Sequence, residues 1–181
     1  MKLFASNMIA SGKIILRDKK LADAQDDYTW QSDPELAQLD ASQPLKMTFS
    51  RYLSDYASIL SYSPSLRHSF AIETSDGKHI GNCAYFNIDE KQGSAEVGLM
   101  IGDRSYWDQG YGSDTITALV DRIFRETDLK RTYLKTLVSN ARAQRCFQKC
   151  GFTPYGHQVR DGFSFVFMEL QRKQWHESIN P

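Results

Sequence analysis

Features that would direct a chain to a membrane, an oxidising compartment or nucleic acid are scarce in this sequence. Three of its 181 residues are cysteine, and an odd number fits free thiols in a reducing compartment better than a disulfide framework. No stretch approaches the roughly 18 continuous apolar residues of a transmembrane helix, and the opening MKLFASNMIASGK is too polar for a secretion signal. Lysine plus arginine equals aspartate plus glutamate, at 22 each, so the overall charge does not favour nucleic-acid binding. We therefore expect a cytoplasmic protein with no membrane and no nucleic-acid partner.

Repeats, linkers and low-complexity tracts are also missing. A length of 181 residues with 41% apolar residues suffices for one domain with a real core. The sequence therefore predicts a single domain over residues 1–181, with a core from about 13 to 171.

The charges are unevenly distributed although they cancel overall. The segment 21–40 contains six acidic residues and no base, whereas the segment 122–149 contains eight bases against two acids. The basic segment could neutralise the phosphates of a nucleotide, and the acidic one could attract a cationic amine. Both could equally be solvated helix faces.

Apolar periodicity and turn residues predict the order of the elements. The first half reads as a strand, two helices and an antiparallel meander, in which Asp76-Gly77 favours a hairpin turn. The expected segments are a strand at 13–17, helices at 21–31 and 48–61, strands at 69–74, 79–88 and 96–101, a helix containing 116–124, a strand at 131–138, a helix from 140 to 151, strands at 152–160 and 163–170, and a polar, frayed tail at 171–181. This order predicts an α/β fold with a mixed, mostly antiparallel sheet flanked by about four helices.

The segment 95–152 holds the most informative pattern, a strand followed by a glycine turn and a helix. A helix start leaves backbone N–H groups unpaired and carries a partial positive charge, so a glycine turn leading into it can bind phosphate oxygens. Gly110 and Gly112 have no β-carbon to obstruct an anion. The turn is not a Walker-type nucleotide loop, because no Lys-Ser or Lys-Thr follows, and it lacks the third glycine of a dinucleotide fingerprint.

Three segments in this order resemble the GNAT acetyltransferase superfamily. They are the strand Ala95-Glu96-Val97-Gly98, the turn Tyr-Trp-Asp-Gln-Gly-Tyr-Gly over 106–112, and NARAQRCFQKCGF over 140–152. Together they are more specific than any one alone, and Trp30 with Asp33-Pro34-Glu35 extends the match. Within the superfamily the chain resembles the branch that includes the ribosomal-protein N-terminal acetyltransferases. The resemblance implies the GNAT fold, acetyl-CoA as co-substrate and no metal.

The resemblance also implies which residues bind acetyl-CoA. The turn amides would hold the pyrophosphate, Asn140 and the helix after it would line the pantetheine arm, and a backbone N–H within 99–101 would polarise the thioester carbonyl. Gly98 would mark a bulge that splays its strand from a neighbour, although an isolated strand glycine could as well relieve packing. The implied cofactor-binding residues are Leu99, Met100, Ile101, Trp107, Asp108, Gln109, Gly110, Tyr111, Gly112, Ser113, Asn140, Phe147 and Lys149. Asn140 is also a preferred helix N-cap, and Lys149 could be an ordinary exposed lysine.

Glu96 is the candidate general base for an amine acceptor. It precedes the strand end where the thioester would lie, and it could act directly or through water. The alternative is an ordinary strand glutamate that pairs with a neighbouring charge.

Two positions depart from the family pattern. Trp107 stands where Gln or Arg often begins the turn, which matters little if backbone amides bind the phosphates. Phe147 stands where many members have a tyrosine that can protonate the CoA thiolate, so either another group serves or the thiolate leaves without a protein acid. Cys146 and Cys150 are spaced as a ligand pair, but they lack His or Cys partners nearby, so we expect packed thiols.

The predicted activity is acetyl transfer from acetyl-CoA to a primary amine by direct attack in a ternary complex. A protein N-terminal α-amine is favoured by the subfamily resemblance, and a small-molecule amine (polyamine, aminoglycoside or amino acid) remains an alternative. A CoA-binding module without turnover is a third interpretation, because Phe147 replaces the usual acid. The superfamily resemblance leaves a homodimer open.

Overall fold

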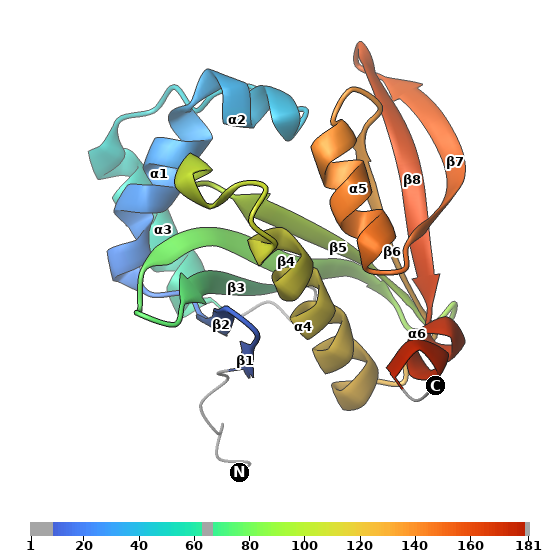
Figure 1. The fold of residues 1–181 in the computed structure, drawn as a ribbon. Helices are drawn as coiled ribbons and strands as arrows, with labels where there is room; N and C mark the ends of the chain where they lie inside the picture. The colour runs from blue at the N-terminus through green and yellow to red at the C-terminus, as the bar shows by residue number, and fades with distance from the viewer. Residues whose placement is uncertain (1–8, 63–66, 180–181) are drawn as a thin grey trace.

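The computed structural model describes residues 9–62 and 67–179. Eight strands form one sheet in the order β1-β2-β3-β4-β5-β6-β8-β7, and every neighbouring pair is antiparallel except β5 and β6 (Figure 1). The strands are β1 (Ile9–Ser11), β2 (Ile14–Asp18), β3 (Arg67–Thr74), β4 (His79–Asp89), β5 (Ser94–Ile101), β6 (Arg131–Leu137), β7 (Thr153–Arg160) and β8 (Phe163–Gln171). The predicted mixed, mostly antiparallel sheet is therefore confirmed.

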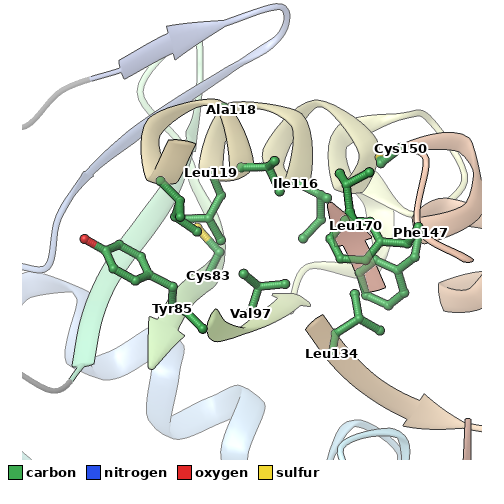
Figure 2. Packing of buried hydrophobic residues seen from close by; sticks show 14 of the residues in the cluster. Cys83, Tyr85, Val97, Ile116, Ala118, Leu119, Leu134, Phe147, Cys150 and Leu170 are labelled. Carbon is green, nitrogen blue, oxygen red and sulfur yellow. The ribbon is translucent and has the colours of Figure 1, made fainter. Parts of the chain in front are cut away.

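Helices cover both faces of this sheet. α4 and α5 lie on one face, and α1 and α3 lie on the other (Figures 1 and 2). The helices are α1 (Ala24–Ser32), α2 (Pro34–Leu39), α3 (Phe49–Ser61), α4 (Tyr111–Glu126), α5 (Ala141–Lys149) and α6 (Arg172–Ile179), with 3-10 turns η1 (Leu21–Asp23) and η2 (Arg104–Tyr106). None of the helices within the described ranges is long and apolar enough to cross a membrane.

The main core forms where α4 packs on the sheet. Ile116, Leu119 and Ile123 recur at helical spacing and are fully buried, and beneath them lie β4 and β5 with Cys83 and Val97 (Figure 2). Burial of each such aliphatic side chain contributes roughly 1.5–3 kcal/mol before entropic costs. The core therefore fixes α4, and with it the glycine turn at the start of this helix.

The parallel pair β5–β6 is short, and this shapes the rest of the molecule. Its register covers Ser94, Ala95 and Glu96 of β5, paired with Arg131, Thr132 and Tyr133, and beyond Glu96 the two strands diverge (Figure 1). β6, β8 and β7 continue on the far side of the opening together with α5. The sheet is thus split at its centre, with α4 on one side of the split and α5 on the other.

Three expectations need correction. Gly98 pairs regularly with Ala84 of β4, and the irregularity in that ladder lies between Phe86 and Asp89, so the predicted bulge at Gly98 is wrong. The described part of the chain has two helices beyond the expected four, the short α2 and the C-terminal α6. The tail is not frayed over 172–179: it forms α6, which Arg172 anchors by donating to backbone carbonyls, including that of Leu129.

Candidate active site

A pocket of about 220 Å³ opens at the split in the sheet. Its walls are the end of β5, the glycine turn, the start of α4, one side of α5 and the end of α2. The predicted cofactor residues that line it are Leu99, Met100, Ile101, Trp107, Asp108, Gly110, Gly112, Ser113, Asn140, Phe147 and Lys149. Eleven of the thirteen predicted residues thus surround one pocket, although they come from segments up to 50 residues apart.

Gln109 and Tyr111 lie on the turn but not among the lining side chains. The Gln109 amide donates to the Ser105 carbonyl, and the Tyr111 ring packs edge-on against Tyr106 at 5.0 Å between centroids. Both side chains therefore brace the turn and leave the backbone N–H groups of these residues facing away from the two contacts.

The glycine turn has the backbone geometry of an anion site. Gly110 is the N-cap of α4 with φ +88°, and Asp108 also has positive φ, at +57°. The first N–H groups of α4 have no partner within the helix and point along its positive end. A β-carbon at Gly112 would lie 3.2 Å from the Cys146 sulfur and 3.4 Å from a Leu99 methyl, so a side chain at this position would press on both. The turn can therefore present its amides to phosphate oxygens at close range.

Lys13 braces the turn from outside the motif. It lies between β1 and β2, its ammonium donates to the Gln109 carbonyl over 2.7 Å, and its backbone N–H donates to Asp114 of α4. Sequence reasoning missed this residue, since nothing local marks a lysine almost one hundred residues before the turn as part of it.

Trp107 connects the two sides of the pocket. Its indole N–H donates to the Ile101 carbonyl over 2.7 Å, and the Arg142 guanidinium of α5 lies 3.3 Å from its ring centroid. Arg104 lies 5.5 Å from the same ring and forms hydrogen bonds with Asp33 and Glu35. A chain of contacts therefore runs from α5 across the pocket to α2. The Trp107 side chain links the two elements, so its identity matters beyond the backbone amide that it contributes to the turn.

At the end of β5, the backbone N–H and C=O groups of successive residues face alternately toward β4 and toward the split. The Met100 carbonyl faces β4, because it lies 2.1 Å from where a β-carbon of Gly81 would be, whereas the Ile101 carbonyl faces Trp107 at the split. N–H and C=O of one strand residue point the same way, and neighbouring residues alternate. Leu99 and Ile101 therefore direct their N–H groups into the split, and Met100 contributes its side chain.

α5 begins and ends as its sequence predicted. The Asn140 side chain accepts a hydrogen bond from the Ala143 N–H over 3.1 Å. Asn140 is therefore the N-cap of α5, and it also lines the pocket. Phe147 is buried with its ring 6.1 Å from Phe152. It therefore offers the pocket an apolar surface and no proton.

Glu96 lies at the apex of the split, not in the pocket lining. It is buried, accepts a hydrogen bond from Asn87 Nδ2 over 2.8 Å and lies 3.6 Å from Lys135 Nζ. Strand alternation places Glu96 on the same face as Met100, opposite to Val97 and α4. Glu96 therefore pairs with a neighbouring charge, Lys135, which was the alternative to a role as general base. Its carboxylate lies on the side of the sheet away from α4.

α2 supplies a wall that sequence reasoning did not assign to the site. Leu36, Leu39 and Asp40 line the pocket opposite α5. Asp33 caps this helix by accepting from the Glu35 and Leu36 N–H groups, and Pro34 follows it. An Asp-Pro pair at a helix start was a signal that could have predicted α2.

Among the described residues, no group of three His, Cys, Asp or Glu side chains is placed to hold a metal ion.

Comparison with protein families identifies the class of protein. The family of acetyltransferase (GNAT) domains matches residues 13–153, from the start of β2 to the start of β7. The chain belongs to this family, and it is an acetyl-CoA-dependent N-acetyltransferase.

Individual relatives agree with this assignment. An uncharacterized N-acetyltransferase, p20, of Bacillus licheniformis is 26% identical over 145 residues, which cover 80% of this chain and 81% of the relative. A spermidine N(1)-acetyltransferase of Vibrio cholerae is 28% identical over 94 residues, 52% of this chain and 54% of the relative. A crystal structure of spermidine N-acetyltransferase from Vibrio cholerae in complex with CoA and spermine superimposes with a TM-score of 0.81 at 19% identity, covering 91% and 98% of the two chains.

Proposed function

We propose that this enzyme acetylates a primary amine carried by a small organic cation. The observation that carries the proposal is the wall formed by α2, where Leu36 and Leu39 place apolar surface beside the Asp40 carboxylate. An ammonium group on a hydrocarbon stem matches such a wall, because the stem packs on the leucines and the charge meets the carboxylate. The spermidine acetyltransferase among its relatives supports the same acceptor class.

In this proposal the glycine turn binds the pyrophosphate of acetyl-CoA. The N–H groups at the start of α4 donate to the phosphate oxygens, and Lys149 and the other bases of α5 add positive charge. Asn140 and Phe147 line the pantetheine arm, which places the thioester between β5 and α5. The N–H of Leu99 or Ile101 then stabilises the negative charge that develops on the carbonyl oxygen.

Glu96 accepts the proton of the amine through water. Glu96 lies three residues before Leu99, about 10 Å along β5 at about 3.3 Å per residue, and its side chain points to the opposite face, so we place a water between it and the amine. The amine attacks the thioester carbon, the C–S bond breaks, and the CoA thiolate leaves. Because Phe147 has no proton to give, the thiolate receives its proton from solvent or from the acceptor.

Thiol release from acetyl-CoA in the presence of an amine panel tests this proposal. Polyamines and amino sugars should be substrates, and Asp40→Asn should raise KM for them about five- to tenfold with little change in kcat, because one charged hydrogen bond is lost. Glu90→Gln, in an exposed turn, is the matched control and should behave as the unaltered enzyme. Equal KM values for Asp40→Asn and the control would overturn the role given to α2.

A protein N-terminal α-amine is the second candidate, and one feature favours it. Every residue of β7 is exposed or half-buried, and this strand forms the edge of the sheet beyond β8. An extended peptide could pair with that edge and direct its terminus toward the split. Peptides with free N-termini therefore belong in the panel, and turnover of peptides alone would favour the branch that includes the ribosomal-protein N-terminal acetyltransferases.

A further inference from the structure

Two thiols meet at the pocket, and acetyl transfer as proposed uses neither. Cys146 lies on α5 and Cys150 at the end of that helix, one turn away, and both sulfurs contact Ser113 of α4: the Ser113 hydroxyl lies 3.5 Å from the Cys146 sulfur, and the Cys150 thiol donates to the Ser113 carbonyl over 3.6 Å. Cys146 is half-buried and lines the pocket, whereas Cys150 is buried. The remaining cysteine, Cys83, is buried beneath α4 (Figure 2).

The surroundings of Cys146 favour its thiolate. The neighbouring Cys150 lowers the pKa of Cys146 most; burial opposes this, and Ser113 and Lys149 add to the lowering. The Ser113 hydroxyl lies 3.5 Å from the Cys146 sulfur in the first turn of α4, where the helix dipole also favours negative charge. The neighbouring Cys146 and burial raise the pKa of Cys150, whose thiol donates to the Ser113 carbonyl over 3.6 Å.

The end of α5 also allows the two sulfurs to be joined. Side chains one helical turn apart have β-carbons about 5–6 Å apart, and a disulfide needs about 3.5–4.5 Å. Cys150 is the cap residue of α5, and Gly151 follows with φ +89°. To form a disulfide, the two β-carbons must come about 1–2 Å closer, and this movement affects the last turn of α5 and not the helix interior.

We propose that Cys146 is a site of oxidation by hydroperoxides, that Cys150 is its resolving thiol, and that CoA bound in the pocket shields it. The Cys146 thiolate attacks the peroxide, the O–O bond breaks, an alkoxide or hydroxide leaves, and the sulfur loses two electrons to become a sulfenic acid. The Cys150 sulfur then attacks the Cys146 sulfur, and the hydroxyl group leaves as water with the Cys150 proton. One peroxide is reduced and one disulfide forms.

Oxidation in this position would oppose cofactor binding. The Cys146 sulfur lies where a β-carbon of Gly112 would almost touch it, so an added oxygen enters the space beside the anion-binding turn. Formation of the disulfide moves the turn of α5 that carries Phe147 and Lys149. This consequence and the shielding rest on the proposed placement of acetyl-CoA, whereas the oxidation chemistry does not.

Peptide mass spectrometry after treatment with hydrogen peroxide tests the oxidation chemistry. The unaltered protein should form a Cys146–Cys150 disulfide while Cys83 stays reduced, and Cys150→Ser should accumulate a sulfenic acid at Cys146 that dimedone traps. Cys146→Ser should leave Cys150 reduced. Oxidation of Cys150 at an unchanged rate in Cys146→Ser, or of Cys83 as fast as Cys146, would overturn the assignment.

Desulfo-CoA, which has no thiol to react, tests the shielding. At about 100 times its Kd, it should slow oxidation of Cys146 by about tenfold or more and leave the slow reaction of Cys83 unchanged. Selective oxidation of Cys146 without any protection would overturn the shielding and the placement of CoA together, while the oxidation site itself would stand. Acetyl transfer is measured separately on the reduced enzyme, so that failure of the proposed acceptor class is distinguished from failure of the oxidation or of the shielding.

Discussion

Asn87 donates a hydrogen bond from Nδ2 to Glu96 Oε2 over 2.8 Å, and Asn87 itself has φ +49°. Few residues other than glycine adopt this conformation without strain, and asparagine is among those that do. The residue lies at the irregularity between Phe86 and Asp89, where β4 leaves its regular register with β5. An unusual backbone conformation in one strand therefore orients the carboxylate of the next.

Glu96→Gln removes the proposed base and keeps the shape of the side chain. The variant should lose about a hundredfold or more in kcat, the usual range for a general base, with acetyl-CoA affinity retained. Initial rates and a separate binding measurement for acetyl-CoA check this. Glu169→Gln, which alters a carboxylate on β8 that pairs with Arg131 and lies two strands away from Glu96, is the matched control. Full activity in Glu96→Gln would remove the residue from the mechanism.

Asn87→Gly removes the amide that orients Glu96 and tolerates the positive φ. We expect kcat to fall about tenfold with KM for the amine nearly unchanged, because one hydrogen bond to a charged group is lost without altering the pocket walls. Steady-state kinetics with one good amine substrate suffice. A purely structural role would instead lower the melting temperature and leave kcat intact.

Gly110→Ala tests the glycine turn. An alanine at φ +88° costs about 1–2 kcal/mol, which should lower the melting temperature by a few degrees and weaken acetyl-CoA binding. Gly77→Ala is the matched control, since Gly77 has φ +86° and open space around its β-carbon position in a distant hairpin. Both variants should lose similar stability, and the weaker thermal shift with acetyl-CoA should be confined to Gly110→Ala. Equal cofactor affinity in the two variants would contradict a role for the turn in binding.

His68 gives the stability a dependence on pH. Its ring stacks on Tyr85 at 4.4 Å, and burial lowers its pKa from 6.5, with Arg122 adding to the effect and Glu126 opposing it. The unfolded chain therefore binds a proton more readily than the folded one, and stability falls as pH drops from about 6.5 toward the folded pKa. His68→Phe keeps a stacked ring and should lose less melting temperature between pH 7.5 and 5.5. An identical loss in both proteins would refute this origin.

Local signals predicted the elements that carry the cofactor residues. Thr48 accepts from the Arg51 N–H at the start of α3, and Gly151 ends α5 with φ +89°, as residue types at those positions indicated. The glycine turn before α4 was likewise predictable, because the apolar spacing within α4 indicates where this helix begins. Each of these features depends on interactions within a few residues.

Contacts between distant segments were not predictable in the same way. The sequence placed Glu96 near the thioester, but where the β5–β6 pairing ends is determined by how α4 and α5 pack on either side of the split. Lys13 beside Gln109 and Arg142 over Trp107 also depend on the assembled fold. Their residue types are common on protein surfaces, so no local pattern distinguishes them.

The contact between Trp107 and Arg142 gives the enzyme an intrinsic optical probe. Of its three tryptophans, Trp30 and Trp175 are buried at 8% and 6% exposure, so a ligand in the pocket meets the indole of Trp107. With acetyl-CoA placed as proposed, its phosphates attract the Arg142 guanidinium away from the ring, so we expect the electric field at the indole, and with it the emission, to change. Cofactor binding can therefore be followed in real time, with no label and with no acceptor identified in advance.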